Sequence, residues 1–374
     1  MSALVVKNLN CFYQENQILN NLDINLQDNE IVCLLGESGC GKTTLLRAVA
    51  GLQTDTSGDI TINDNIVDSS TLSVAPEKRK VGLIFQDYAL FPHLNVFDNI
   101  AFSLTAMTRV EKRKSVEEVL ALVQLSDYDQ RFPHQLSGGQ QQRIAIARAL
   151  AYKPELMLLD EPFSNLDQHV RFQLIKDIRL LLKKRAMSAL FVTHSKEEGF
   201  AFADKIALMK AGKIIQIGVP QQLYNYPNTR YVADFMGKSN YVDVQVQSAN
   251  SYQSDFGLLN NANTIEVPHG TNLQLLIRPE QFTLNPCADG QASITEVDFL
   301  GAFQQLTVSF KNKLYLVKQH NQFAGYQVGD KAEMTINVHD FVTFPEESLP
   351  RKQYLSSTTN CKNQFAGFNE LSQG

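Results

Sequence analysis

A chain of 374 residues is too long for one ordinary hydrophobic core, so its length alone predicts two domains. Its net charge of −5, without a cluster of Lys and Arg, argues against a nucleic-acid partner, because neutralising phosphates requires concentrated positive charge. No apolar run approaches the length of a membrane span and the start of the chain lacks a secretory pattern, so we expect a soluble protein that reaches a membrane only through a partner.

The first part of the chain alternates apolar runs with helical patterns. The segment EIVCLLG at 30–36 predicts a buried strand, and helical periodicity follows over 42–52. Two further apolar runs, at 155–162 and 188–194, flank a helical pattern at 170–185. This order of strands and helices predicts a parallel sheet with right-handed crossovers.

The remaining segments indicate how the chain is divided. Two helical patterns between the early and late strands predict a helical insert over about 88–150, within a first domain of residues 1–235. Beyond residue 235, β-forming segments separated by Asn, Gly and Pro predict a small all-β domain over 236–347. The polar segment 348–374 is predicted to be a disordered tail. Five widely spaced cysteines predict reduced thiols rather than disulfides or a zinc site.

The stretch GESGCGKTT joins the first predicted strand to the first predicted helix. Gly36, four further residues, Gly41, Lys42 and Thr43 form the phosphate-loop pattern, in which backbone N–H groups point inward at a positive helix end. We expect Lys42 to reach the β- and γ-phosphates of a bound nucleotide and the Thr43 hydroxyl to bind Mg²⁺. The alternative is a glycine-rich turn that merely caps a helix. The predicted cradle comprises Gly36, Glu37, Ser38, Gly39, Cys40, Gly41, Lys42, Thr43 and Thr44.

An acidic pair follows the apolar run LMLL. Asp160 is predicted to position Mg²⁺, and Glu161 to orient or deprotonate the attacking water. An isolated Asp-Glu pair usually forms a solvated turn, but its position at the end of a buried strand favours a metal site.

The stretch LSGGQQQR, from Leu136 to Arg143, resembles the signature of the ATP-binding cassette (ABC) family, whose LSGGQ motif it contains in full. This motif opens a predicted helix, where backbone N–H groups can bind a second phosphate. The resemblance implies a P-loop NTPase cassette that forms a homodimer, with each signature closing the ATP of the other copy. The signature residues assigned to this contact are Ser137, Gly138, Gly139 and Gln140.

Other positions take their roles from the same resemblance. Tyr13 is expected to stack on adenine, with Phe12 as the neighbouring candidate, and Gln86 to contact Mg²⁺ and link the site to the insert. Asp167 is expected near the dimer interface, and His194 at the γ-phosphate. Taken alone, a histidine at a strand end is more often structural.

The rest of the chain suggests what the ATPase drives. An apolar patch of Tyr88, Leu90, Phe91 and Pro92 suits a short helix of a membrane permease, although ordinary packing of the insert is the alternative. The segment 275–286, LLIRPEQFTLNP, resembles the OB-like regulatory domain of importer ATPases, most closely those for ferric iron. This implies a permease, a periplasmic binding protein and the cytoplasmic face of a bacterial inner membrane. Polyamine, sulfate or sugar uptake, and a non-transport regulatory ATPase, are the alternatives.

Overall fold

The computed structural model describes residues 2–164, 166, 168–262, 264, 267–321, 325–337 and 340–345, with the side chains of 168–170 left aside. It divides the chain into two compact units, Met1–Leu223 and Tyr224–Gly374. The domain boundary predicted after residue 235 therefore falls inside the second unit. The predictions for Asp167 and for the tail at 348–374 lie outside the described residues.

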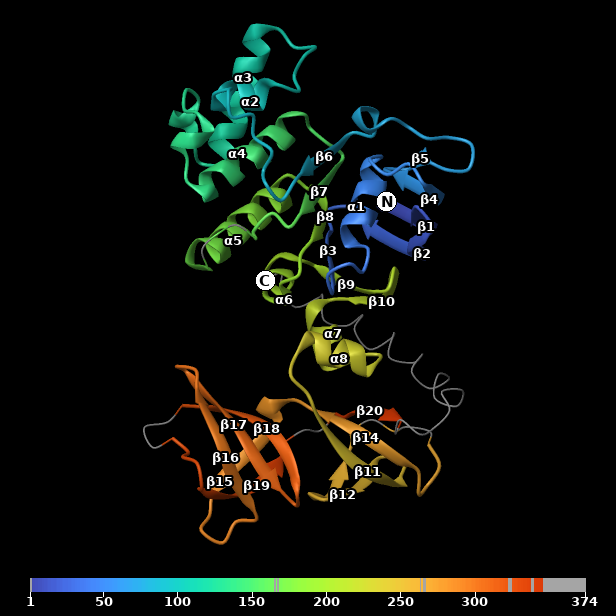
Figure 1. Cartoon of the computed structure of the whole chain (residues 1–374), viewed down its shortest axis with the longest axis vertical. Helices are drawn as coiled ribbons and strands as arrows, with labels where there is room; N and C mark the ends of the chain where they lie inside the picture. The colour runs from blue at the N-terminus through green and yellow to red at the C-terminus, as the bar shows by residue number, and fades with distance from the viewer. Residues whose placement is uncertain are drawn as a thin grey trace, which may run out of the picture. The chain divides into compact units, whose positions relative to one another are not determined.

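A six-stranded sheet forms the centre of the first unit, in the order β10-β9-β3-β8-β7-β6 (Figure 1). Strand β3 runs parallel to β8 and β9, and β7 runs parallel to β6 and β8, which confirms the predicted parallel core. Only β10 is antiparallel to its neighbour. The strands are β3 (Ile31–Gly36), β6 (Val81–Ile84), β7 (Leu156–Asp160), β8 (Ser188–Val192), β9 (Lys205–Lys210) and β10 (Lys213–Gly218).

The residues of β3 and β8 are all buried, as expected for strands covered on both faces of a parallel sheet. Three helices follow strands of this sheet along the chain: α1 (Lys42–Ala50), α5 (Gln168–Lys184) and α6 (Lys196–Phe202). Each begins just beyond the carboxyl end of the strand before it. This edge of the sheet therefore collects the loops that carry the predicted site.

A second, antiparallel sheet of the first unit was not predicted from the sequence. Its order is β2-β1-β4-β5, and its apolar residues pack with those of α1 in one core. Register shifts interrupt β1 at four places, which breaks the simple alternation that marks a strand. The strands are β1 (Ser2–Tyr13), β2 (Asn16–Gln27), β4 (Thr56–Ile62) and β5 (Asn65–Asp68).

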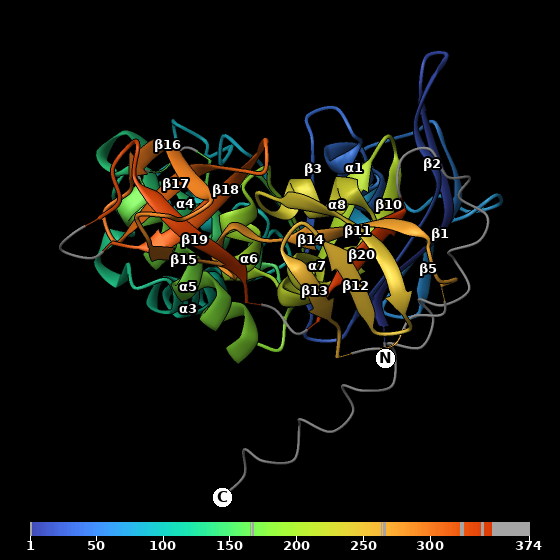
Figure 2. The ribbon, with the colours of Figure 1, turned by 90° about the horizontal axis from the view of Figure 1, so that it is seen from below.

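The helical insert contains α2 (Val96–Ala101), α3 (Arg109–Leu122) and α4 (Gly138–Ala151). Side chains of Asn95, Thr108 and Ser137 cap the starts of these helices, so each helix begins where a capping residue ends the preceding loop. Two short 3-10 turns, η2 (Ser126–Tyr128) and η3 (Pro133–Gln135), lie in the same insert, and a third, η1 (Pro76–Lys78), precedes β6. Figures 1 and 2 both show α4 well apart from α1, with strands of the central sheet between them.

The second unit consists mainly of antiparallel strands, as predicted. One sheet has the order β13-β12-β11-β14-β20 and the other β15-β19-β16-β17-β18, and their apolar side chains share one core. Two short helices, α7 (Pro220–Asn225), which crosses the boundary, and α8 (Arg230–Met236), precede them, and η4 (Pro279–Gln281) lies between β14 and β15. The strands are β11 (Asn240–Ser248), β12 (Ser251–Ser254), β13 (Gly257–Asn260), β14 (Asn272–Ile277), β15 (Phe282–Pro286), β16 (Ala292–Phe299), β17 (Phe303–Phe310), β18 (Lys313–His320), β19 (Lys331–Ile336) and β20 (Val342–Pro345).

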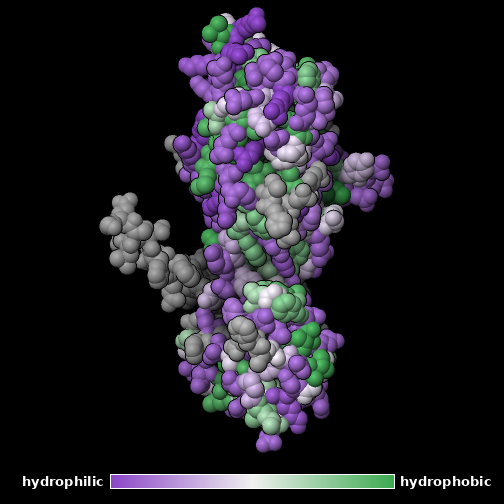
Figure 3. Space-filling model, turned by 90° about the vertical axis from the view of Figure 1, so that its left-hand side faces the viewer, coloured by the Kyte–Doolittle hydropathy of each residue, from purple (hydrophilic) through white to green (hydrophobic). Residues whose placement is uncertain are grey.

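On the face drawn in Figure 3, hydrophilic residues predominate and hydrophobic residues are scattered between them. Among the described residues, no helix has both the length and the apolar character needed to cross a membrane.

Candidate nucleotide site

The phosphate loop connects β3 to α1 and depends on its glycines. Gly36, Gly39 and Gly41 have φ values of 154°, 79° and 104°, a region that side chains rarely adopt. A Cβ at Gly36 would lie 2.4 Å from the carbonyl oxygen of Met209, and one at Gly41 would lie 2.7 Å from Leu19 Cδ2. Within the described part of the chain, no side chain caps α1 and its first turn holds no acidic residue. The helix start is therefore suited to binding an anion.

Lys42 points back into this loop. Its Nζ donates hydrogen bonds to the carbonyl oxygens of Gly36 at 2.8 Å and Glu37 at 2.9 Å, and the residue is only 7% exposed. The Sγ atom of Cys40, which is also buried, lies 3.8 Å from the same nitrogen. The lysine thus places a positive charge at the centre of the loop, where a phosphate would need it.

Thr43 and Asp160 meet at the end of β7. The Thr43 hydroxyl donates to Asp160 Oδ1 at 3.1 Å, so the first turn of α1 is tied to the carboxyl end of a neighbouring strand. Burial raises the pKa of the Asp160 carboxyl, and the hydrogen bond from Thr43 partly opposes this shift. A hydroxyl and a carboxylate are both hard oxygen ligands, so this pair fits Mg²⁺ and its bound water.

Glu161 and His194 form a second pair beside the first. Glu161 Oε2 lies 3.2 Å from His194 Nδ1, with the histidine side chain 62% exposed and the glutamate side chain 23% exposed. Glu161 has a φ of 45°, and its backbone N–H donates to Val192 O at 3.0 Å. A left-handed conformation at a residue other than glycine is strained and indicates a constrained position. The structure therefore holds a carboxylate and an imidazole together at the edge where the phosphate loop opens.

Three interacting residues near His194 were not predicted from the sequence. The Thr193 hydroxyl donates to Glu198 Oε2 at 2.7 Å, and Arg171 Nη1 lies 3.5 Å from Glu198 Oε1. Arg171 also donates to Leu166 O at 2.7 Å. Burial raises the pKa of Glu198, which is 3% exposed, and the Thr193 hydrogen bond opposes the shift.

The spacing S-x-x-E at 195–198 is the only sequence signal for this group, because it matches a capping box. Ser195 does cap α6, accepting from Glu198 N at 3.2 Å, but the Glu198 side chain turns to Thr193 instead of the cap. The capping pattern therefore predicts the start of α6 and not the buried carboxylate.

The signature residues lie in another part of the first unit. Ser137 Oγ accepts from Gln140 N at 3.4 Å and Gln140 Oε1 accepts from Ser137 N at 2.9 Å, which forms a capping box at the start of α4. Ser137 and Gly138 are exposed. Since α4 and α1 are well apart in Figures 1 and 2, a single copy of the chain does not bring the signature to its own phosphate loop.

The other predicted residues differ in their exposure. Tyr13 ends β1 and is 67% exposed, whereas Phe12 is half-buried, so Tyr13 offers the freer ring for stacking. Gln86 is exposed in the turn after β6. Tyr88 is 5% exposed, which corrects its place in the predicted docking patch, because a buried ring cannot receive a partner. Of that patch, Leu90 and Phe91 are half-buried and Pro92 is exposed.

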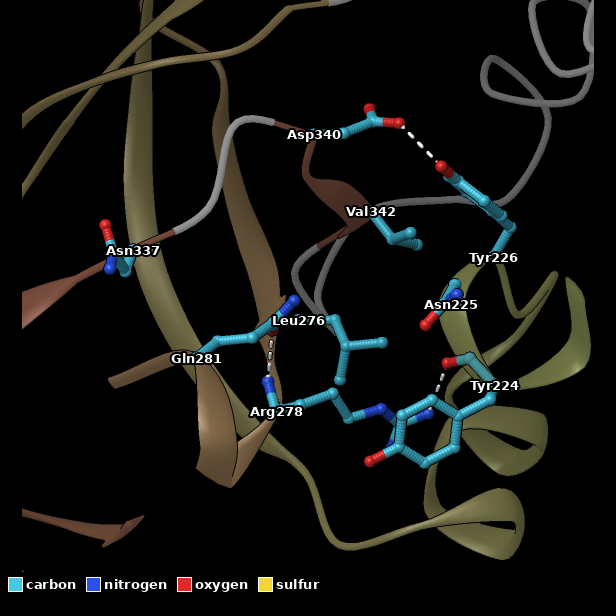
Figure 4. Close-up of a pocket in the computed structure, with 9 residues that line it drawn as sticks. All are labelled: Tyr224, Asn225, Tyr226, Leu276, Arg278, Gln281, Asn337, Asp340 and Val342. Atoms are coloured by element: carbon cyan, nitrogen blue, oxygen red, sulfur yellow. Dashed lines mark hydrogen bonds between the residues drawn. The ribbon is translucent and has the colours of Figure 1, made fainter. Parts of the chain in front are cut away.

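The second unit contains a cavity of about 340 Å³ that involves none of the predicted site residues. Figure 4 shows the Arg278 side chain beside the Tyr224 ring, with a hydrogen bond to Tyr224 O of 2.8 Å, and a 2.9 Å bond between Tyr226 and Asp340. Arg278 is 3% exposed and also donates to Ala233 O at 2.9 Å. Its bonds fix α7 and α8 to the strands of this unit. The cavity is lined by Tyr224, Asn225, Tyr226, Leu276, Arg278, Gln281, Asn337, Asp340 and Val342.

Comparison with known proteins links this geometry to one family. A family model described as "ABC transporter" matches residues 19–164. An Fe(3+) ions import ATP-binding protein of Haemophilus influenzae is 42% identical over 82% of this chain and 87% of its own length. A protein of the same description from Vibrio cholerae is 36% identical over 91% and 97%, and a sulfate/thiosulfate import ATP-binding protein of Photorhabdus laumondii is 38% identical over 82% and 85%.

Solved structures match the cassette part of the chain. A dimeric ATP-binding cassette in a post-hydrolysis state, bound to ADP and phosphate, is 30% identical with a TM-score of 0.51, over 58% of this chain and 98% of that chain. A cassette from Clostridium perfringens, part of an ABC transporter complex, is 28% identical with a TM-score of 0.55, over 59% and 90%. This chain therefore belongs to the ABC transporter family, among its import ATP-binding proteins.

Proposed function

We propose that this chain hydrolyses ATP as the motor subunit of a ferric-iron importer. The observation that carries the proposal is the pairing of Thr43 with Asp160 and of Glu161 with His194, side by side at the carboxyl ends of β7 and β8. One pair is suited to a metal-bound phosphate and the other to an attacking water. Together with the phosphate loop they supply the positioning and charge that phosphoryl transfer requires.

The roles of the side chains follow from their chemistry. The loop N–H groups and Lys42 bind the phosphates, and Glu161 accepts a proton from the water whose oxygen attacks the γ-phosphorus. The bond from that phosphorus to the β–γ bridging oxygen breaks, giving ADP and phosphate. His194 contacts the γ-phosphate and lies within reach of Glu161. Thr43, Asp160 and Gln86 would hold Mg²⁺, which would supply positive charge to offset the charge that develops on the phosphates.

Two copies of the chain are needed for a complete site. The exposed Ser137 and Gly138 lie at the start of α4, a helix that Figures 1 and 2 show apart from α1, and a helix start can bind an anion. The dimeric cassette among the solved relatives supports the same arrangement. ATP binding closes the two copies head to tail, and Tyr13 stacks on the adenine of its own copy.

The cargo is inferred from the relatives. Several are described as Fe(3+) import proteins, while a sulfate/thiosulfate relative keeps sulfate as the second candidate. Iron is the cargo of the assembly and not a cofactor of this subunit. The proposed partners are a membrane permease and, through it, a periplasmic binding protein, with this chain at the cytoplasmic face of a bacterial inner membrane.

The variant Glu161→Gln tests the catalytic assignment. Because a general base contributes about 10²- to 10⁴-fold, we expect turnover to fall by that factor while ATP binding persists and ATP produces a stable dimer in size-exclusion chromatography. Glu197→Gln is the matched control, because Glu197 is exposed on α6 and its side chain accepts from the Ser195 hydroxyl at 3.0 Å instead of pairing with His194. Rapid turnover by Glu161→Gln would refute the role of Glu161.

The cargo needs a separate experiment. A strain that lacks the gene is expected to lose uptake of radioactive ferric iron under iron limitation while it keeps growth on sulfate as its sulfur source. The reverse result would assign sulfate instead. Failure of the protein to co-purify with any integral membrane permease would favour a non-transport regulatory ATPase.

A further inference from the structure

The turn that follows β6 is strained and needs support. Tyr88 and Ala89 have φ values of 61° and 45°, so two successive residues with side chains lie in the left-handed region. The left-handed conformation is unfavourable for a residue with a side chain, and it persists only where the surroundings enforce it. Gln86 lies two residues before this pair, between the end of β6 at Ile84 and the strained turn.

Arg148 of α4 holds the strained turn. Its Nη1 donates to Ala89 O at 2.6 Å and its Nη2 donates to Tyr88 O at 2.9 Å, so both nitrogens of the guanidinium fork bind the two strained residues. The guanidinium carbon also lies 5.7 Å from the centre of the Phe91 ring. A planar fork that binds two adjacent carbonyls fixes position more tightly than a point charge would.

Asn99 of α2 holds the next part of the same loop. Its Oδ1 accepts from Phe91 N at 2.8 Å, and its Nδ2 donates to Phe91 O at 3.1 Å and Leu94 O at 3.0 Å. Asn99 is completely buried. The loop from Tyr88 to Leu94 is therefore attached to the helical insert, whereas β6 belongs to the central sheet. Gln86 lies in the connection between β6 of the central sheet and the loop attached to the helical insert.

The helix that carries Arg148 is the signature helix. It begins at Gly138, directly after Ser137, and Arg148 lies on its last full turn. A helix rises 1.5 Å per residue, so Arg148 lies about 15 Å along the axis from the start of α4. Because a helix of this length moves as a rigid unit, a displacement of its first residues also displaces Arg148. We propose that Arg148 is a positioning residue that couples the signature to Gln86. Engagement of the signature by the partner copy's nucleotide moves α4, and Arg148 carries the strained turn and Gln86 with it. This inference rests on the proposed dimeric ATPase.

The test is a double-mutant cycle between Arg148→Gln and Gln86→Ala, measured in the purified full chain. Since outer-shell partners of metal ligands cost about 10- to 100-fold when removed, we expect Arg148→Gln to lower turnover and raise the half-saturating Mg²⁺ concentration by about tenfold or more. ATP affinity should stay within about twofold, because the phosphate loop is untouched. In the Gln86→Ala background, Arg148→Gln should cause no further loss, because it acts through Gln86.

Arg143→Gln is the matched control. Arg143 lies on the same helix and is paired with Asp177 at 2.6 Å and Val123 O at 3.0 Å, away from the Gln86 loop. We expect it to leave turnover and Mg²⁺ dependence unchanged. Arg148→Lys keeps the charge but cannot span both carbonyls, so it should show a smaller loss and serves as the test if Arg148→Gln does not fold.

Two outcomes would overturn the inference. One is that the losses from Arg148→Gln, or from Arg148→Lys, and Gln86→Ala multiply, which is the behaviour of independent sites. The other is that Arg143→Gln reproduces the Arg148 phenotype, which is the behaviour of general damage to α4. Failure of the proposed function looks different, because the wild-type protein would then lack ATPase activity or ATP-dependent dimer formation altogether.

Discussion

Arg79 should be a major contributor to the stability of the first unit, although it lies outside the nucleotide site. The residue is 2% exposed and its guanidinium binds four acceptors. It pairs with Asp68 at 2.6 Å and donates to the carbonyl oxygens of Ala48 at 2.9 Å, Val49 at 3.2 Å and Val74 at 2.8 Å. Two of these carbonyls belong to the last turn of α1, the helix whose other end forms the phosphate loop.

The size of the effect of Arg79→Met follows from burial. Breaking a buried ion pair by removing one partner costs about 3–5 kcal/mol, because the remaining charge is left without compensation. The Asp68 side chain is 13% exposed and keeps some contact with water, so we take the lower value, about 3 kcal/mol. For a unit of roughly 150–250 residues, each kcal/mol shifts Tm by about 2–4 °C, which gives a fall of about 6–12 °C.

Differential scanning calorimetry of the full chain measures this shift. The transition of the first unit is the one that ATP moves to higher temperature, because a ligand stabilises the unit that binds it. Lys78→Met is the matched control: Lys78 is the exposed neighbour, and its loss should change the unfolding free energy by less than about 0.5 kcal/mol.

The same experiment has an internal check. Arg79→Lys should lie between wild type and Arg79→Met, since an ammonium cannot bind four acceptors in the geometry of the guanidinium. Below the transition, Arg79→Met should bind ATP with unchanged affinity, because the phosphate loop is at the opposite end of α1. A Tm change no larger than that of Lys78→Met would refute the reasoning.

Two further predictions concern the loop and the thiols. Gly39→Ala should cost only the left-handed backbone penalty of roughly 1–2 kcal/mol, since nothing lies within 4 Å of its added Cβ. Gly36→Ala adds a clash at 2.4 Å with a backbone oxygen and should therefore unfold at a clearly lower temperature than Gly39→Ala. Equal melting temperatures of the two variants would contradict this prediction. In the native protein at pH 8, the exposed Cys287 should react with iodoacetamide. Cys11 should not react, because burial raises the pKa of its thiol to about 12. Mass spectrometry that found Cys11 alkylated before Cys287 would contradict the predicted order of reactivity.

The parallel core and the arrangement of the phosphate loop followed from local sequence patterns. A buried strand, a glycine-rich turn and a helix are adjacent in the chain, so the spacing of Gly36, Gly41 and Lys42 already fixes their geometry. The place of Asp160 at the end of β7, with Glu161 directly after it, was predictable for the same reason, because the pair ends an apolar run. The contacts between Thr43 and Asp160 and between Glu161 and His194 then follow from the parallel order of the strands, whose carboxyl ends share one edge.

The antiparallel N-terminal sheet was missed, although part of its signal was present. Buried and exposed residues alternate in the second half of β2, at Leu22, Ile24 and Leu26, as expected for a strand with one buried face. In β1 the register shifts break this alternation, and asparagines in both strands resemble turns. The sequence pattern of β1 therefore identifies it poorly, and pairing with β2 and β4 decides its structure.

The two compact units of the structure divide at Tyr224, before the change in composition on which the predicted boundary rests. The change to β-forming composition begins after residue 235, but Arg278 donates to Tyr224 O and to Ala233 O and so attaches α7 and α8 to the second unit. Tyr224 OH also donates to Glu280 Oε1 at 2.6 Å. The amino-acid composition of a segment reflects its secondary structure, whereas the boundary between two units depends on contacts between residues far apart in the chain.

The residues that were not predicted from the sequence share one physical property: each is a charged side chain held inside the fold by its partners. Arg79, Arg148, Glu198 and Arg278 are charged groups that bind backbone or side-chain atoms of other elements, and three of them are at least nine-tenths buried. Charged residues are mostly exposed in folded proteins, so a sequence pattern assigns them to the surface. Burying such a group is favourable only if the fold supplies several acceptors or a partner at once. Ala48 O lies 31 residues from Arg79 and Ala233 O lies 45 residues from Arg278 along the chain, so no local window contains the full set of acceptors of either arginine. Local patterns therefore predict which residues contact the nucleotide, whereas only the folded chain identifies the charged side chains that hold the surrounding elements in place.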